Sequence, residues 1–400
     1  MSRYVGLNSI TTKLIPTIIG LTFVVISSKI IGPNKIGEFI IYLITYNLFK
    51  LICEGGFSLV LSDQKYSKED LYASNLHYII FGLVGCIVFN IIRFGEINTN
   101  SIILQISLLL FCIQIFYQNN LKMNLDYGKL SRLTSYSSLV SVLISIILVV
   151  TTKSEIILYV RYLLFELAML IFLKMNSNID YGFGKFTRLR SLYGKSLHFL
   201  FQGLSESIIE LLLVSSIRAS VGVGSVGYYN RSNQLVDAGI KMPIQGFRAA
   251  YIGLVTKNDI KIRKEVGFVF FFLILSTIIA YVISIQGEFL IINLLGYDWL
   301  PLLSWLKYGI LVAWAYSFEQ IATSNMYILK RESFITPINI LIKIPICVLI
   351  YLGFDLNSWS YWSWIYFIST TIYFSITTIK INNEYRNSND LDVSRSGGSF

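Results

Sequence analysis

The chain has 400 residues, of which 54% are hydrophobic and only 14% are charged, and its mean hydropathy is +0.63. A soluble chain of this length does not need so much apolar surface, so the composition excludes a soluble globular protein and predicts an all-α polytopic membrane protein. The apolar runs are continuous, which excludes the alternating segments of a transmembrane β-barrel. The net charge of +10 is better explained by a basic cytoplasmic face than by binding to nucleic acid.

Apolar runs of about 18–25 residues predict twelve membrane-spanning helices. They cover residues 10–31, 36–61, 75–93, 101–119, 133–150, 155–174, 195–217, 226–255, 265–286, 301–322, 335–353 and 359–380. The first run lacks a small-residue cleavage site, so we expect it to be retained as a span. The sequence from Ile381 onward is polar, and we expect a disordered cytoplasmic tail there.

Lysines and arginines in the predicted loops indicate the orientation. With the N-terminus inside, most of them lie on the inner side. The outer side holds only Lys29, Lys35, Arg93, Lys153 and Arg218. This bias predicts a multi-pass protein with both termini in the cytoplasm.

The two halves of the chain show a weak internal similarity. A shift of about 190 residues places Gly32 on Gly222, Gly37 on Gly227 and Gly56 on Gly246. Each half has six predicted spans that start from the same side, which requires a pseudo-twofold axis along the membrane normal. We therefore expect two six-helix lobes, residues 1–175 and 195–380, with an inner loop at 176–194 between them and the tail at 381–400.

The predicted eighth span, 226–255, carries charge along most of its length. At about 100° per residue its polar side chains fall on one arc. These residues are Asn230, Arg231, Gln234, Asp237, Lys241, Gln245 and Arg248. Charged side chains facing lipid are costly, so this arc must face protein or a wet cavity. Three cations against one anion predict a water-filled path for an anionic substrate, whereas ion pairs that only fix helix packing are the alternative.

Charged residues also occur inside the second and seventh predicted spans. Lys50 and Glu54 lie one helical turn apart and share a face with Tyr46, and Glu206 and Glu210 have the same spacing. We predict that Lys50, Arg231, Lys241 and Arg248, with Gln234 and Gln245, bind the anionic group. We predict that Glu54, Glu206, Glu210 and Asp237 couple transport to an ion or tune the charge of the site.

Single charges also occur as Arg161 and Glu166 in the sixth predicted span, Lys307 and Glu319 in the tenth, and Lys343 in the eleventh. Arg161, Glu166 and Lys307 are interpreted as residues that reach the interface or pair structurally.

No pattern typical of a soluble active site is present in the sequence. The four cysteines lack metal-ligand spacing, and the histidines, His77 and His198, stand near span ends, where an interfacial position is expected. There is no phosphate-binding loop and no nucleophile elbow. We therefore expect no catalytic residue, metal or cofactor.

Three sequence elements resemble a known family. They are SKIIGPNKIGEFIIYL in the first half, VGVGSVGYYNRSNQLV in the second half and LLGYDWLP before the tenth span. They are similar to elements of the multidrug/oligosaccharidyl-lipid/polysaccharide superfamily, and the chain resembles its Wzx-type O-antigen flippases. Ser232 or Asn233 stands where the family usually has a small apolar residue.

The resemblance implies two six-helix lobes around a central cavity, as in the multidrug exporters and lipid II flippases. It implies export of an undecaprenyl-pyrophosphate-linked oligosaccharide, such as an O-antigen repeat unit, across the bacterial inner membrane, with a downstream polymerase as a further expected partner. Related lipid II flippases place cations in the second and eighth spans, where Lys50, Arg231, Lys241 and Arg248 stand here. The first span lacks a mid-membrane cation, which favours a glycan other than that of lipid II.

Two alternatives stay open at this stage. An ion-coupled multidrug exporter of the same fold would need an acidic or apolar cavity for cationic drugs, and the predicted one is basic. A membrane-embedded polysaccharide polymerase or ligase usually has a large outer loop, and every predicted outer loop is short.

Overall fold

The computed structural model describes residues 19–61, 66–92, 98–124, 126–177, 179–236, 285–328 and 356–396, together with isolated positions between 274 and 352. Their regular structure is entirely helical. The helices are α2 (Pro33–Glu54), α3 (Phe57–Leu61), α4 (Lys68–Ile92), α5 (Thr99–Met123), α6 (Tyr127–Thr152), α7 (Ile156–Met175), α8 (Phe186–Ser220), α9 (Val223–Val236), α12 (Leu302–Ile328), α14 (Leu356–Ser396) and the short 3-10 helix η2 (Tyr297–Trp299). Two short apolar helices, Ile19–Ile31 and Ile285–Leu294, complete the set.

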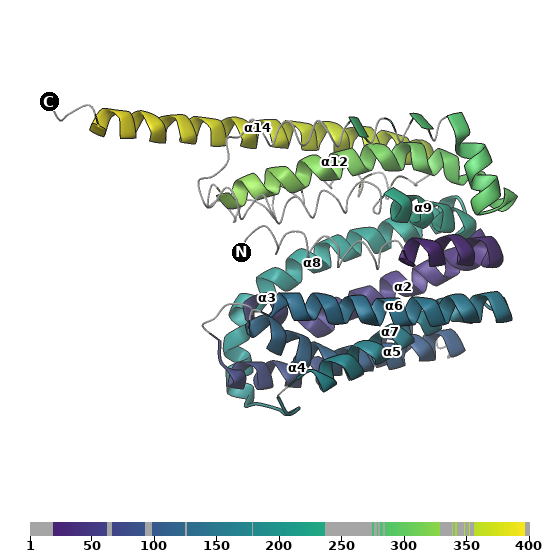
Figure 1. Ribbon diagram of the computed structural model, residues 1–400, viewed down its shortest axis with the longest axis horizontal. Coiled ribbons are helices and arrows are strands. Elements are labelled where there is room, and N and C mark those ends of the chain that lie inside the picture. The colour runs from purple at the N-terminus through teal and green to yellow at the C-terminus, as the bar shows by residue number, and fades with distance from the viewer. Residues whose placement is uncertain are drawn as a thin grey trace. The chain divides into compact units, whose positions relative to one another are not determined.

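The chain divides into two compact units, Met1–Gly227 and Tyr228–Phe400. In the first unit α2 is the central helix and packs on α4, α5 and α8, while α7 packs on α5 and α6 (Figure 1). Its buried side chains, among them Ile36, Ile40 and Tyr46, form the core of the unit. Helix α8 therefore belongs to the packing of the first unit. The lobe boundary that we placed at 176–194 remains a prediction.

A pair of glycines divides the predicted second span. α2 ends at Glu54, because Gly55 adopts a left-handed conformation with φ of 62° and Gly56 follows with φ of 73°. A Cβ on Gly55 would lie 2.5 Å from His77 Nε2, so this turn has no room for a side chain. The prediction of one continuous helix over 36–61 is therefore wrong at this point, since α3 begins separately at Phe57.

In the second unit α12 and α14 lie side by side along much of their length (Figure 1). The end of α9 joins them, because Val236 packs against Leu306, Ile310 and Ala313 of α12. Polar contacts reinforce the pair: the Asn325 side-chain amide lies 3.4 Å from the hydroxyl of Thr377. α14 continues to Ser396, beyond Ile381 where the sequence predicted a disordered tail. No glycine or proline interrupts the chain between Ile381 and Ser396, so the helix has no local reason to end earlier.

Several helices are built to meet hydrocarbon. Within the described residues, five helices are long and apolar enough to cross a membrane: α2, α4, α5, α6 and α7. Their outer faces expose large apolar side chains, such as Ile87 and Ile91 of α4 and Ile147 of α6. A soluble protein rarely exposes continuous apolar faces of this kind, whereas lipid requires them.

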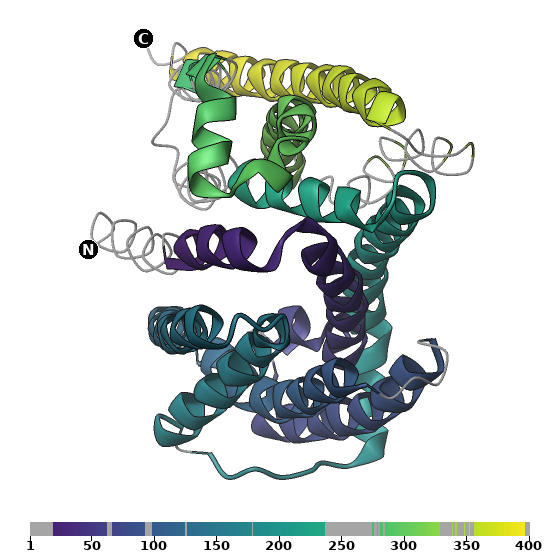
Figure 2. The ribbon, with the colours of Figure 1, turned by 90° about the vertical axis from the view of Figure 1, so that its right-hand side faces the viewer.

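An ordered connection closes one end of the first unit. Residues 179–185 run from α7 to α8 along the end of the bundle (Figure 2). Gly184 donates its N–H to the Tyr72 carbonyl at 2.8 Å, and the Asn75 amide donates to the Gly182 carbonyl at 2.7 Å. The Tyr181 ring packs on Phe116, and partial burial raises the pKa of its hydroxyl. These contacts fix the connection onto α4 and α5.

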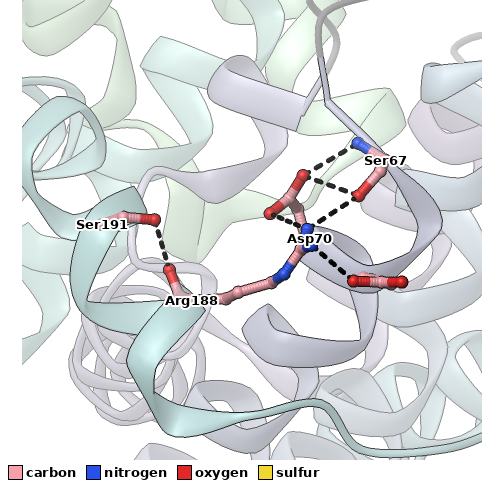
Figure 3. Close-up of polar contacts among 5 residues, drawn as sticks. Ser67, Asp70, Arg188 and Ser191 are labelled. Carbon is pink, nitrogen blue, oxygen red and sulfur yellow. Dashed lines mark hydrogen bonds and ion pairs between the residues drawn. The ribbon is translucent and has the colours of Figure 1, made fainter.

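The first turn of α8 is held to α4 by ion pairs (Figure 3). Arg188 lies 2.5 Å from a Glu69 oxygen and 3.4 Å from Asp70 Oδ1. Asp70 in turn accepts hydrogen bonds from the backbone N–H and hydroxyl of Ser67, which precedes α4. Because Arg188 and Glu69 are largely exposed, this cluster sets the position of the helix start more than it stabilises the fold.

Candidate functional site

A fully buried carboxylate lies at the centre of the first unit. Glu166 of α7 has no exposed surface, and three side chains donate hydrogen bonds to it. Lys50 Nζ lies 2.7 Å from Glu166 Oε1, and the Tyr46 hydroxyl lies 2.9 Å from the same oxygen. The side-chain amide of Gln114, on α5, donates to Glu166 Oε2. Three helices therefore converge on one carboxylate.

The local sequence explains this convergence. Tyr46 and Lys50 stand one turn apart on α2, so both side chains point to the same neighbour. Tyr46 is also packed edge-on against Tyr162 of α7, at 6.0 Å between ring centroids, which keeps α2 and α7 in register. A charged group in an apolar interior needs this degree of pairing and hydrogen bonding to remain ionised.

The Lys50 ammonium group has a second neighbour on its other side. Its Nζ lies 4.2 Å from the centroid of the Phe111 ring, a geometry that attracts a cation to the face of the ring. The Lys50 side chain is 24% exposed, whereas Glu166 is not exposed at all. Lys50 is therefore the accessible member of the pair.

A second Lys–Glu pair joins the same two helices near their other ends. Lys35, in the first turn of α2, lies 3.2 Å from Glu155, the residue before α7 begins. Both side chains are substantially exposed, 50% and 33%. This pair offers a control for the buried pair, because it has the same residue types and joins the same helices without burial.

The described part of the eighth predicted span brings together two of the residues that we expect to bind the anionic group. Arg231 and Gln234 lie one turn apart on α9, and Arg231 donates a hydrogen bond to Gln234 Oε1. Arg231 is almost fully buried. Lys241, Arg248, Gln245 and Asp237 lie outside the described residues.

The expected coupling acids occupy different surroundings. Glu54 is the last residue of α2, half-buried, and lies within electrostatic range of Lys122 on α5. Glu210 is exposed on α8, and Glu206 is a residue of the same helix. Lys50, which the sequence placed beside Glu54, pairs in the structure with Glu166 instead.

The second unit has its own buried carboxylate. Glu319 of α12 is 3% exposed and accepts a hydrogen bond from the Tyr366 hydroxyl of α14. Tyr366 is stacked on Trp362 at 5.0 Å, and Trp362 is stacked on Trp359 at the same distance. An aromatic column thus leads along α14 to this carboxylate.

His77, which stands near the start of the third predicted span, is buried among the helices of the first unit. Its Nε2 lies 3.0 Å from the Ile52 carbonyl, and its Nδ1 lies 2.6 Å from the Tyr193 hydroxyl. Because a carbonyl only accepts, Nε2 carries the proton and Nδ1 accepts from Tyr193. The histidine therefore joins α2, α4 and α8. Among the residues that the structure describes, no group of His, Cys, Asp and Glu could hold a metal ion.

Residues 26–250 match the family model for polysaccharide biosynthesis proteins. This match covers more than half of the chain. The chain belongs to this family. A search of curated protein sequences finds no match.

Solved transporters share the fold of this polysaccharide biosynthesis protein. An inward-facing multidrug resistance MATE family transporter of the MOP superfamily aligns with a TM-score of 0.69 and 12% identity, covering 93% of this chain and 96% of that chain. An outward-facing form aligns with a TM-score of 0.63 and 14% identity, covering 94% and 96%. A MOP superfamily transporter from Pyrococcus furiosus, whose binding pocket is described as of reverse polarity, aligns with a TM-score of 0.64 and 12% identity, covering 94% and 95%.

These alignments confirm the predicted fold class: the family member is an all-helical, multi-pass membrane protein with the MATE-like fold over nearly its full length. At such low identity the likeness concerns the fold alone.

Sequence reasoning left Glu166 out of the candidate site. Its signal was present in the sequence, since a glutamate within the apolar run of 155–174 must find a partner on another helix. The spacing of Tyr46 and Lys50 also indicated that one face of α2 meets a polar group. What the sequence lacked was the neighbour relation between α2, α5 and α7.

Proposed function

We propose that this chain is a flippase that moves an undecaprenyl-pyrophosphate-linked oligosaccharide, an O-antigen or related surface polysaccharide repeat unit, from the inner to the outer leaflet of the bacterial inner membrane. The observation that carries the proposal is the combination of family and fold. A member of a polysaccharide biosynthesis family with a transporter fold has as its natural cargo a precursor of the polysaccharide.

The charges inside the membrane support an anionic cargo. A pyrophosphate and a hydrophilic glycan cannot enter hydrocarbon without replacement of their hydration. Lys50 on α2 and Arg231 on α9 are cations within predicted spans, and Lys241 and Arg248 continue the same arc of the sequence. In this proposal they line a cationic central cavity, while the polyprenyl tail stays in lipid.

The mechanism is alternating access, in which the cavity opens to one side of the membrane and then to the other. Affinity for the pyrophosphate has to stay modest so that the product can leave. Lysine suits this requirement, because it is a flexible point charge and does not form a rigid bidentate clamp. Glu54, Glu206, Glu210 and Asp237 are proposed to couple the cycle to an ion or to tune the cationic site.

The two alternatives have less support. A multidrug exporter shares the fold, but the basic arc of 226–255 repels the cationic compounds that such exporters carry. A polymerase or ligase would share the place in polysaccharide synthesis, but the likeness to transporters extends over 93% of this chain. The flippase accounts for both the fold and the charge.

Deletion of the encoding gene in a host with a surface polysaccharide tests the proposal. We expect lipid-linked repeat units to accumulate on the inner leaflet, and a plasmid-borne copy to restore export. Accumulation of single repeat units on the outer leaflet would indicate a polymerase and would contradict the flippase. Unchanged surface polysaccharide with increased drug sensitivity would favour the multidrug exporter.

A further inference from the structure

We propose that Glu166 is a counter-ion of Lys50 that the substrate displaces. When an anionic group of the substrate binds the Lys50 ammonium group, the Glu166 carboxylate loses that partner and takes up a proton. When the substrate leaves, Glu166 releases the proton and the ion pair forms again. This inference rests on the proposed function, because it assigns a regulatory group to the anion site. It adds a carboxylate on α7 to a site predicted only from α2 and the eighth span.

The unequal burial of the pair is the first support. Lys50 is 24% exposed and Glu166 is 0% exposed, although their charged atoms lie only 2.7 Å apart. An incoming anion can therefore reach the ammonium group but not the carboxylate. Because the Lys50 stem is flexible, a small change of rotamer moves its Nζ from Glu166 to the anion without movement of the helix.

The fate of the carboxylate is the second support. Once Lys50 turns away, a buried negative charge would remain with only neutral donors, Tyr46 and Gln114. A carboxylate in that position is neutralised by taking up a proton, since an isolated buried charge costs far more than a buried carboxylic acid. Net charge is then conserved: the substrate's negative charge replaces that of Glu166 beside Lys50.

The third support is a ready acceptor for the new proton. Gln114 is 1% exposed, and its Oε1 has no hydrogen-bond partner among the residues that the structure describes. Its amide nitrogen already donates to Glu166 Oε2. A half-turn of the amide would present Oε1 to a Glu166 hydroxyl. Gln114 would then accept a hydrogen bond from the protonated acid in place of the one that it now donates to the carboxylate.

Other groups around the carboxylate do not supply a competing charge. The titratable neighbours are Lys50 and Tyr46 from α2, Cys112 from α5 and Tyr162 of α7 itself. From α6, the remaining helix packed on α7, Ser137 donates to the Met169 sulfur. Within the part of the chain that the structure describes, Lys50 is therefore the one cation that pairs with Glu166.

The inference predicts a linkage between anion binding and proton uptake. Each anion bound at Lys50 should take up part of one proton, so affinity should weaken as pH rises. Removal of the Glu166 charge should remove both the competitor and the proton uptake. Glu166→Gln is therefore expected to bind anions about tenfold more tightly, because Lys50 no longer has to leave a charge-assisted hydrogen bond.

Calorimetric titration of the purified full-length protein with farnesyl pyrophosphate tests this linkage. Titrations in buffers of different ionisation enthalpy give the protons taken up per bound anion. We expect the unaltered protein to take up protons when the anion binds, and Glu166→Gln to lose the uptake that comes from the site. Glu155→Gln alters the exposed pair between the same helices and should take up as many protons as the unaltered protein. Comparison of variants removes the contribution of the probe's own ionisation.

Equal affinity and equal proton uptake in Glu166→Gln and the unaltered protein would overturn the inference. If Glu166→Gln does not fold, Gln114→Leu keeps the ion pair but removes the proton acceptor, and it should reduce proton uptake; unchanged uptake would again overturn it. A wrong flippase proposal would give a different result. The unaltered protein and every folded variant would then fail to move lipid-linked oligosaccharide in vesicles, whether or not they bind the anion.

Discussion

Lys50 Nζ lies 2.7 Å from the fully buried Glu166 carboxylate, while near the other ends of the same two helices Lys35 lies 3.2 Å from the partly exposed Glu155. The two pairs have the same chemistry and differ in burial. Burial makes an ion pair costly to break from one side, because the remaining charge has no water. A change of charge at Lys50 or Glu166 should therefore have a larger consequence than one at Lys35 or Glu155.

Lys50→Met is expected to destabilise the protein by about 3–5 kcal/mol, because Glu166 loses its cation and has to take up a proton to stay buried. Lys35→Met should cost less than about 1 kcal/mol, since the charges of that pair are solvated. Melting temperatures of both variants in detergent measure the difference. Equal melting temperatures would contradict the assigned role of burial.

Gly184→Ala is expected to loosen the connection between α7 and α8. A Cβ at this position would lie 2.5 Å from the Ala73 backbone nitrogen, which cannot move out of the way as a side chain could. The hydrogen bond from Gly184 to Tyr72 would be lost with it. Limited proteolysis should then cut within 179–185. Gly194→Ala is the control, because no atom of the described residues lies within 4 Å of its added Cβ. It should gain up to about 1 kcal/mol of helix stability.

Tyr366→Phe is expected to cost about 1.5–3 kcal/mol, the usual contribution of a hydrogen bond to a charged group. The substitution removes the hydroxyl that donates to Glu319 and keeps the aromatic column on Trp362. Tyr361→Phe, on the exposed face of the same helix, should leave the melting temperature unchanged. A thermal shift no larger than that of the control would show that Glu319 does not depend on Tyr366.

Replacement of Arg231, Lys241 and Arg248 together by glutamine is expected to abolish export of surface polysaccharide while the protein still inserts in the membrane. The reason is that these cations replace the hydration of the pyrophosphate in the proposed cavity. Lys257 and Lys261, in a predicted inner loop, provide a control double substitution. Full export by the triple variant would contradict a role in transport and would show that these three cations serve only helix packing.

Much of the fold follows from the sequence because lipid imposes simple demands. The run at 155–174 predicts α7 to within a residue or two at each end, since an apolar stretch of that length has one stable form in a bilayer. The break at Gly55 and Gly56 was less evident, because the flanking residues are as apolar as the rest of the span. The break depends on the positive φ of these glycines and on the nearby His77 ring. The hydrophobic pattern of the sequence predicts neither of them.

The candidate site was predicted less completely, for a physical reason. The face of α2 that carries Tyr46 and Lys50 could be read from spacing, but its partner lies 116 residues further along the chain at Glu166. These groups meet only because α2 and α7 both contact α5 and approach each other at Tyr46 and Tyr162. The sequence predicted Lys50 as part of the anion site but did not identify Glu166 as its counter-ion.

The most direct test of the account is flipping by the purified chain in vesicles. Proteoliposomes would carry the host's lipid-linked oligosaccharide, and the fraction of glycan open to oxidation by external periodate would be followed over time. The account predicts that this fraction rises from about half toward completion when the protein is present and stays at about half in protein-free vesicles. A fraction that stays the same with and without folded, inserted protein would contradict it.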